Sequence, residues 1–393
     1  MVWRRECSAA WWTSIALWVL ALEILATPAV FGAGQFILSN IRVEPDPVEA
    51  YNRVTFRMNF SGAQAPVGRL WLRVARNGRQ ADWVPIEIGP APAAAPAGWL
   101  ASWWELEEAG SYHVSMVAED TRGQRSAPLQ LPFTVLEPSP RYEEMAYLSD
   151  GLRIKAYLYR PPRPGVSPAI IYSHGSRTRA ELPEPGRYEW LAYRLARLGY
   201  LTLVAERRGY GGSDGIGVVG GEGGGLNNLR AGLVGEVRDV VAAIAFLKGR
   251  SDVDGTRIAL VGKSLGGLVS LAAAAEDPGV RGVASLAGGY GFSSRMMSPE
   301  MLFVQDTIRA AAQRIKASTL LLHAQNDRII PSELSRFVHQ ELEQRGIPSS
   351  LKVYPPFGLG GREVEGHTLF DGVDGFPYFW QDVTDFLAGV LRP

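Results

Sequence analysis

A serine at the centre of a glycine-rich pentapeptide is the residue of this chain that most clearly indicates chemistry. Ser264 lies in the pattern G-x-S-x-G over residues 262–266. The largely apolar run 257–261 before it predicts a buried strand, and the small residues 267–275 after it predict a helix. A sharp turn from strand to helix exposes the serine hydroxyl and brings the helix N-terminus close to a developing oxyanion. The pattern therefore predicts a nucleophilic serine.

Two other structures share features of this pentapeptide. A glycine-rich turn with an N-capping serine has the same local composition. Gly-Lys-Ser also ends the phosphate-loop pattern, but that pattern needs a glycine at position 257, where this chain has Arg257. It also needs a loop where residues 258–261 form an apolar run. We therefore favour the nucleophile and expect no nucleotide binding.

A nucleophilic serine needs a base, and the base needs a carboxylate that fixes its tautomer. His367, in the stretch E-G-H-T-L-F, is the candidate base, and Asp327, just beyond a predicted strand at 319–323, is the candidate acid. Asp371 and Asp374 are rival acids, and His367 could instead be a surface-loop histidine. We favour Asp327, since groups that follow parallel strands converge at one sheet edge. The remaining histidines are expected to be structural or exposed: His113, His174, His323 and His339.

The elements that must position these groups form a second domain, residues 138–393. Its pattern alternates strands with helices, which predicts an α/β fold, a doubly wound and mostly parallel sheet with helices on both faces. Predicted strands lie at 168–173, 200–205, 280–286 and 351–354. Predicted helices lie at 189–198, 233–248 and 378–391.

The second domain resembles the α/β-hydrolase family, in particular its dienelactone-hydrolase-like and prolyl-oligopeptidase-like members. The order Ser264, Asp327, His367 is the order of that family. The loop S-H-G-S at 173–176 is similar to the family's His-Gly loop, which implies oxyanion donors at the N–H groups of Leu265 and Ser176. The stretch 206–213 resembles the family's D-x-R-G-x-G-x-S, with Glu206 in place of aspartate and Arg208 expected to bridge loops.

Two further segments border the expected site. The glycine-rich stretch 220–225 is either a flexible loop beside the site or a solvated insertion. Between residues 288 and 314 there is room for a short cap only. Its apolar side chains could line an acyl pocket or simply pack a helix: Met296, Met297, Met301 and Phe303.

A first domain, residues 36–137, is expected to be a smaller all-β sandwich. Short segments such as 54–60 and 112–117 alternate apolar and polar residues with period two, and turn residues separate them. The segment 109–123 resembles the last hairpin of bacterial immunoglobulin-like or fibronectin-like modules. Residues 1–35 are expected to be a signal peptide or an N-terminal anchor, because Arg4 and Arg5 precede an apolar run at 9–22 that Glu23 interrupts.

Composition excludes several classes of function. The 393 residues suggest two domains. Lys+Arg equals Asp+Glu, 40 each, and no basic run occurs, so no nucleic-acid partner is expected. Cys7 is the single cysteine, and no H-x-x-x-H pair occurs, so neither a disulfide framework nor a zinc hydrolase is expected. We expect no metal and no organic cofactor.

The sequence thus predicts an exported serine hydrolase, periplasmic or extracellular, either released or anchored to the membrane by its N-terminal segment, that cleaves carboxylic esters of small molecules. A serine peptidase of the prolyl-oligopeptidase-like type, with a peptide substrate, is the nearest alternative. A binding protein with a disabled hydrolase domain is the alternative from another class, with the sandwich as its working part.

Overall fold

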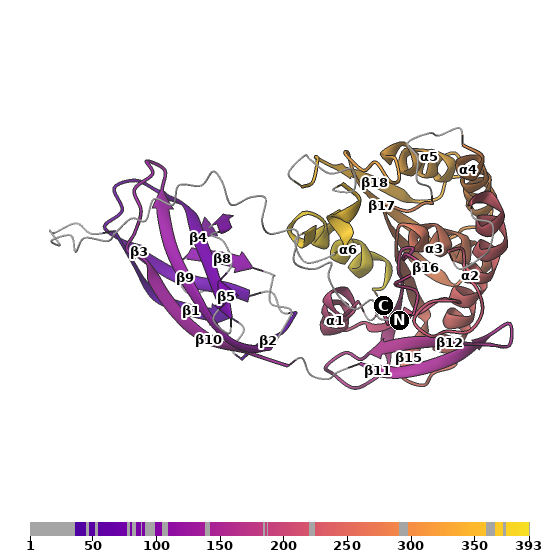
Figure 1. The fold of residues 1–393 in the computed structure, drawn as a ribbon, viewed down its shortest axis with the longest axis horizontal. Coiled ribbons are helices and arrows are strands. Elements are labelled where there is room, and N and C mark those ends of the chain that lie inside the picture. The colour runs from indigo at the N-terminus through magenta and orange to yellow at the C-terminus, as the bar shows by residue number, and fades with distance from the viewer. Residues whose placement is uncertain are drawn as a thin grey trace, which may run out of the picture.

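The structure, a computed structural model, describes residues 36–392 with internal gaps. The gaps are 45–46, 52–53, 77–78, 81–83, 88, 91–98, 104–108, 138–141, 184, 187, 220–224, 291–297, 359–365 and 372–374. Several expectations lie outside the described residues: the N-terminal segment 1–35, most of the glycine-rich stretch, and Met296, Met297 and Asp374. Figure 1 shows a strand-rich first part joined to a larger part in which strands and helices alternate.

The first part consists of two sheets packed face to face, as the period-two pattern predicted. Phe56 from one sheet and Leu70 and Val114 from the other are fully buried in one common core. The likeness to immunoglobulin modules stays a prediction. One sheet has the order β1 (Ile37–Glu44), β3 (Val54–Ser61), β8 (Trp99–Trp103) and β7 (Gly89–Pro90). The other has the order β2 (Val48–Glu49), β10 (Leu129–Leu136), β9 (Gly110–Asp120), β4 (Val67–Arg76) and β5 (Arg79–Gln80), with β6 (Val84–Glu87) beside β4.

The second part is built on an eight-stranded sheet. Its first two strands form an antiparallel hairpin that joins the sheet antiparallel to β14, and all later neighbours are parallel. The predicted mostly parallel α/β sheet is confirmed. Its order is β11 (Glu143–Ser149), β12 (Leu152–Tyr159), β14 (Leu201–Ala205), β13 (Ser167–Ser173), β15 (Val253–Lys263), β16 (Val280–Leu286), β17 (Ser318–Ala324) and β18 (Ser349–Tyr354).

Helices cover both faces of this sheet, so it is doubly wound (Figure 1). Strand β13 shows why: Ile170 and Tyr172 pack on one face and Ile171 on the other, all buried, which is typical of central parallel strands. Two helices pack on the Ile170 face: α1 (Glu189–Arg197) and α6 (Phe376–Val390). Four pack on the Ile171 face: α2 (Gly225–Lys248), α3 (Leu265–Glu276), α4 (Pro299–Ala312) and α5 (Ser332–Glu343).

Element boundaries differ from the predicted ones mainly in α2, which begins at Gly225 rather than at residue 233. Its added turns contribute Leu229, fully buried, to the core between helix and sheet. Tertiary packing therefore extends the helix beyond its obvious apolar face. Within the described residues, no helix combines the length and hydropathy needed to cross a membrane.

Candidate active site

Ser264 occupies the sharp turn between β15 and α3. Its backbone has φ 56° and ψ −125°, a strained combination for a residue with a side chain, which costs about 1–3 kcal/mol. Neighbouring backbone holds it there: Ser264 N–H donates to the Leu286 carbonyl at 2.9 Å, and the Ser264 carbonyl accepts from Gly289 N–H at 3.0 Å. The end of β16 and the turn after it therefore fix the serine at the carboxyl edge of the sheet.

The two outer glycines of the pentapeptide are needed for close packing of backbone. A Cβ atom on Gly262 would lie 2.2 Å from the Gly266 carbonyl oxygen. A Cβ atom on Gly266 would lie 2.0 Å from the Ser173 carbonyl oxygen and 2.4 Å from that of His174. The pattern G-x-S-x-G thus lets α3 start directly against the end of β13.

The structure brings Ser264, His367 and Asp327 together from three separate segments. His367, in the 3-10 turn η1 (Gly366–Phe370), places Nε2 3.0 Å from Ser264 Oγ. Its Nδ1 lies 2.7 Å from Asp327 Oδ2. Since the carboxylate oxygen accepts, Nδ1 carries the proton and Nε2 is left to accept the serine proton. This is the geometry that a serine nucleophile needs.

Asp327 lies in the turn after β17, where both oxygens of its carboxylate have hydrogen-bond partners. Oδ1 accepts from the N–H groups of Ile329 and Ile330, each at 2.9 Å. Oδ2 faces His367 and also His323, whose Nε2 lies 3.1 Å away. Burial opposes ionisation of this carboxyl, but the hydrogen bonds from His323 and His367 outweigh burial and hold its pKa well below the usual range. Asp327 is therefore a carboxylate at neutral pH.

The loop after β13, predicted to supply an oxyanion donor, lies against the serine. A Cβ on Gly175 would lie 3.3 Å from Ser264 Cβ, so this glycine allows the close approach. Ser176 follows it in an exposed position, and Leu265 is the first residue of α3. His174 is fully buried, and its Nδ1 donates to the Gly175 carbonyl at 2.7 Å, which shapes the loop as expected.

Two buried ion pairs begin at consecutive residues after β14, and one of them reaches this loop. Glu206, fully buried, accepts from Arg177 Nη2 at 2.7 Å, and Arg177 follows Ser176 directly. Arg207, also fully buried, donates through Nε to Glu236 of α2 at 2.7 Å. Glu206, which stands where the family has aspartate, therefore contacts the residue directly after Ser176, and the sequence pattern did not predict this contact.

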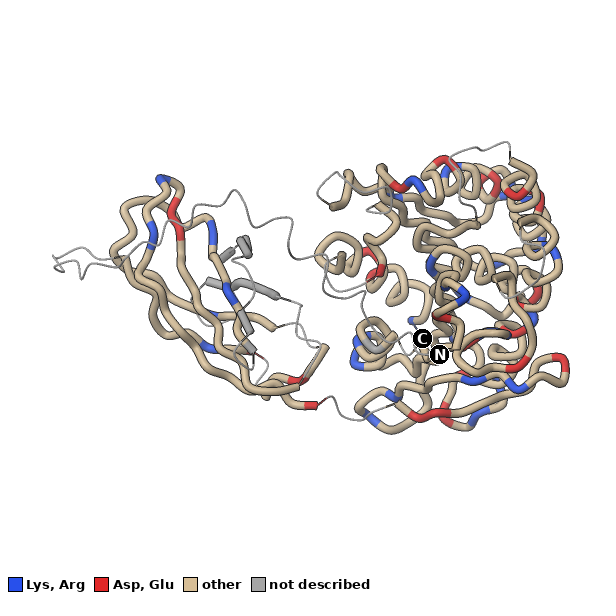
Figure 2. Tube along the Cα trace, viewed as in Figure 1, with Lys and Arg blue, Asp and Glu red and all other residues tan. Residues whose placement is uncertain are grey.

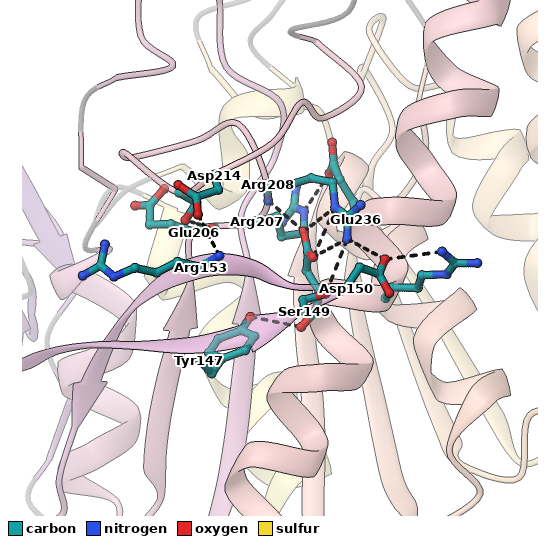
Figure 3. Close-up of polar contacts among 12 residues, drawn as sticks. Tyr147, Ser149, Asp150, Arg153, Glu206, Arg207, Arg208, Asp214 and Glu236 are labelled. Atoms are coloured by element: carbon teal, nitrogen blue, oxygen red, sulfur yellow. Dashed lines mark hydrogen bonds and ion pairs between the residues drawn. The ribbon is translucent and has the colours of Figure 1, made fainter.

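Arg208 bridges the loop after β14 to two other elements, as its position in the sequence predicted. Figure 3 shows Arg208 beside Asp150, in the turn between β11 and β12, with Arg207 and Glu236 next to it. Its Nη2 donates to Asp239 of α2 at 2.7 Å and to Asp150 at 3.2 Å. Tyr147 of β11 also donates, at 3.0 Å, to the Asp239 carbonyl. These contacts hold hairpin, loop and helix together below the site.

Asp371, a rival acid in the sequence, has a different partner. It forms an ion pair with Lys263, the residue just before Ser264, and not with His367. Lys263 is buried although it carries a charge. The ion pair joins the serine turn to the segment that follows η1. No local pattern indicated it, because the two residues are 108 positions apart.

The other singled-out residues lie outside this constellation. Met301 is 1% exposed in the core between α4 and the sheet, so ordinary packing accounts for it, and Phe303 packs on the same core. His113 is exposed on β9, and His339 on α5 bonds Ser349 at 2.7 Å. Among the described residues, no cluster of three or more His, Cys, Asp or Glu side chains could hold a metal ion.

Comparisons with known proteins agree with this architecture. A sequence model of the X-Pro dipeptidyl-peptidase (S15 family) matches residues 150–310. An uncharacterized protein of Mycobacterium tuberculosis is 29% identical over 240 residues, 58% of this chain and 75% of that protein. Acylamino-acid-releasing enzyme of Homo sapiens is 26% identical over 277 residues, 61% of this chain and 35% of that protein. This chain therefore matches only about a third of the human enzyme's length.

Solved structures include a putative dienelactone hydrolase from Klebsiella pneumoniae, with TM-score 0.47 and 19% identity, which covers 63% of this chain and 98% of that one. The sheet order, the serine turn between β15 and α3 and the matched family model agree with the resemblance found in the sequence. The part of the chain from Glu143 onward has the α/β-hydrolase fold.

Proposed function

We propose that this α/β-hydrolase is an exported serine hydrolase that cleaves carboxylic esters through Ser264, His367 and Asp327. The observation that carries the proposal is the unbroken hydrogen-bonded chain from Ser264 Oγ to His367 Nε2, 3.0 Å, and from His367 Nδ1 to Asp327 Oδ2, 2.7 Å. The three residues follow three different strands of the sheet. Local secondary structure therefore does not explain why their side chains meet.

In the first half of the reaction, Ser264 Oγ attacks the ester carbonyl while His367 Nε2 takes the serine proton. The negative charge of Asp327 stabilises the imidazolium that forms. The N–H groups of Leu265 and Ser176 are proposed to donate to the oxyanion. Collapse of the tetrahedral intermediate breaks the ester bond, and the departing alkoxide receives the proton from His367. The acyl group stays on Ser264.

In the second half, water attacks the acyl carbonyl while His367 Nε2 removes one of its protons. The intermediate collapses, Ser264 Oγ leaves and regains its proton from His367, and the carboxylic acid departs. The proposed cycle uses only groups of this chain and water.

The test replaces the nucleophile. Ser264→Ala should lower kcat on p-nitrophenyl acetate by at least about a thousandfold, because no other group can form the acyl-enzyme. A fluorophosphonate probe should label the wild-type protein at Ser264 and leave the variant unlabelled. Both measurements use the full chain.

Ser349→Ala is the matched control, because Ser349 Oγ also bonds a histidine, His339 Nδ1, at 2.7 Å, but away from the triad. It should keep wild-type turnover. Full turnover in Ser264→Ala would refute the ester hydrolase mechanism. Absence of both labelling and turnover in the wild-type protein would favour the binding protein with a disabled hydrolase domain.

A peptidase is the second candidate, and two observations favour it. The matched family model describes X-Pro dipeptidyl-peptidases, and one relative is an acylamino-acid-releasing enzyme. Side-by-side assay of acyl esters and of N-acylated and X-Pro aminoacyl anilides would separate the two. Higher kcat/KM on an anilide than on every ester, lost in Ser264→Ala, would assign the peptidase.

Export is proposed on the N-terminal residues alone. Arg4 and Arg5 before the apolar run 9–22 are typical of a secretory signal or an anchor. Expression with these residues, followed by fractionation and N-terminal sequencing, tests it. Retention of an intact protein inside the cell would contradict export.

A further inference from the structure

The acid of the triad has a second histidine partner. His323 lies at the end of β17, four residues before Asp327, and its side chain is completely buried. Its Nε2 lies 3.1 Å from Asp327 Oδ2 and 2.8 Å from the Ile330 carbonyl oxygen. The sequence suggested only an ordinary strand residue here, so this contact was not foreseen.

The partners of His323 define its hydrogen positions. Both groups near Nε2 are acceptors, so Nε2 carries a proton that it shares between the carboxylate and the carbonyl. On the other side of the ring, Nδ1 lies 2.8 Å from Ser335 Oγ of α5, a hydroxyl that can donate. An imidazole that carries a proton on Nε2 and accepts at Nδ1 satisfies all three contacts. Ser335 thus holds His323 in the tautomer that serves Asp327.

We propose that His323 is a positioning residue of the active site, which anchors the Asp327 carboxylate and shares its charge with His367. Two facts carry the proposal. His323 bonds both ends of the Asp327–Ile330 turn, so it fixes where Oδ2 lies relative to His367 Nδ1. It also competes with His367 for the same oxygen, Oδ2. The proposal rests on the proposed triad function and adds a fourth member to it.

The competition of His323 and His367 for Asp327 Oδ2 predicts the direction in which the pH profile should change. A donor on Oδ2 withdraws negative charge from the carboxylate and so weakens its hold on an imidazolium at His367. Removal of His323 should therefore favour protonated His367 and move the acidic limb of the kcat/KM profile to higher pH. Among the described residues, the ionisable groups that bear on Asp327 are His323 and His367. The Lys263–Asp371 ion pair involves the residue directly before Ser264, and none of the tested substitutions alters it.

The test compares His323→Ala, His323→Gln and Ser335→Ala with the wild-type chain on p-nitrophenyl acetate from pH 5 to 9. In His323→Ala we expect the acidic limb to move up by about half a pH unit or more and kcat to fall about tenfold through looser placement of Asp327. Ser335→Ala should move the limb in the same direction by less. His323→Gln, which restores an N–H donor, should lie between Ala and wild type.

The matched control is His339→Gln, which removes a histidine that also bonds a serine but does not touch the triad. It should leave limb and kcat unchanged. If His323→Ala folds and the acidic limb of its kcat/KM profile matches that of the wild type, the proposal is overturned. A lowered melting temperature would not rescue it, since a purely structural histidine would give the same result. If His323→Ala does not fold, an unchanged limb in both His323→Gln and Ser335→Ala overturns it equally.

A wrong assignment of Ser264, His367 and Asp327 would give a different experimental result from a wrong assignment of His323. In that case Ser264→Ala would keep wild-type turnover, whatever the His323 variants do. The proton between His367 Nδ1 and Asp327 Oδ2 offers a readout without turnover, because it should give a low-field NMR resonance. We expect this resonance to shift in His323→Ala and to stay in place in His339→Gln. An unshifted resonance in His323→Ala would also count against the proposal.

Discussion

His174 shows at the residue scale how burial serves the site. The imidazole is fully buried behind the oxyanion loop, and desolvation, together with the charges of Arg207 and Arg177, holds its pKa well below the ordinary value. His174 is therefore neutral at physiological pH, which suits a ring whose Nδ1 proton is committed to the Gly175 carbonyl. The histidine of this loop is a shaping group and not a second base.

This neutral histidine makes stability depend on pH. Its folded pKa is lower than its unfolded pKa, about 6.5, so below that pH the unfolded chain binds more protons. The stabilisation is complete above pH 6.5 and is lost as pH falls toward the folded pKa. Because the unfolded histidine is only half protonated at pH 6.5, we expect a loss of at most about 1 kcal/mol in the free energy of unfolding between pH 6.5 and 5.5, measured by urea denaturation.

His174→Asn supplies the control, because asparagine can still donate to the Gly175 carbonyl but does not titrate. The free energy of unfolding of this variant should not show the loss between pH 6.5 and 5.5 that His174 causes. Glu206, whose pKa burial raises despite its bond from Arg177, contributes to the pH dependence in the opposite direction. Parallel pH dependences in wild type and variant would contradict the assignment.

At the scale of elements, the site depends on a fixed spacing between the serine turn and η1. The serine turn belongs to the central strand β15, whereas His367 lies on η1, which contacts β17. The Lys263–Asp371 ion pair joins the residue before the nucleophile to the residue that follows η1. Because catalysis depends steeply on placement, we expect such a link to affect the rate of the proposed reaction although it touches no reacting atom.

Asp371→Asn should therefore lower kcat on p-nitrophenyl acetate about three- to tenfold, with KM little changed, because His367 is held less firmly against Ser264. Steady-state kinetics measures both constants. The control is Asp382→Asn, which breaks the exposed Lys352–Asp382 pair between β18 and α6, 2.7 Å in length, and should leave kcat unchanged. Equal kcat for Asp371→Asn and wild type would show that the ion pair does not position the histidine.

At the scale of the whole molecule, the sandwich contacts the hydrolase domain through α1. Glu49 of β2 forms an ion pair with Arg197, and the rings of Tyr51 and Tyr193 lie 5.9 Å apart. Tyr51 packs on the apolar cluster that α1 and α6 form with the sheet. Figure 2 shows acidic and basic residues interspersed along the hydrolase domain, so this pair is a local match and not part of an extended field of one sign.

Charge reversal tests this contact. Glu49→Arg should lower the unfolding temperature of the sandwich in calorimetry, because two cations then face each other. The double variant Glu49→Arg/Arg197→Glu should recover most of the loss, with a coupling of about 0.2–1 kcal/mol, as is usual for partly exposed ion pairs. The new acid in the last turn of α1 is slightly unfavourable, by a few tenths of a kcal/mol. Additive effects of the two substitutions would mean that the contact does not hold the domains together.

Much of the fold and of the candidate site could be predicted because the signals are local. Period-two strands, the alternation of strands and helices, and the pattern around Ser264 each depend on short stretches of chain. Asp327 could be favoured over Asp371 because it follows a strand directly. The start of α2 could not be placed, since its first turns are helical through packing of Leu229 and not through an obvious pattern.

The sequence by itself determined which chemical groups are available and in what order, because a serine turn, an acid after a strand and a late histidine are each recognisable within about ten residues. Only the tertiary structure decided which groups meet. His323 on Asp327, Lys263 with Asp371, and Glu206 with the oxyanion loop join positions that share no periodicity or motif. Such contacts follow from the convergence of loops at one edge of the sheet, which is a property of the folded chain and leaves no trace in neighbouring residues.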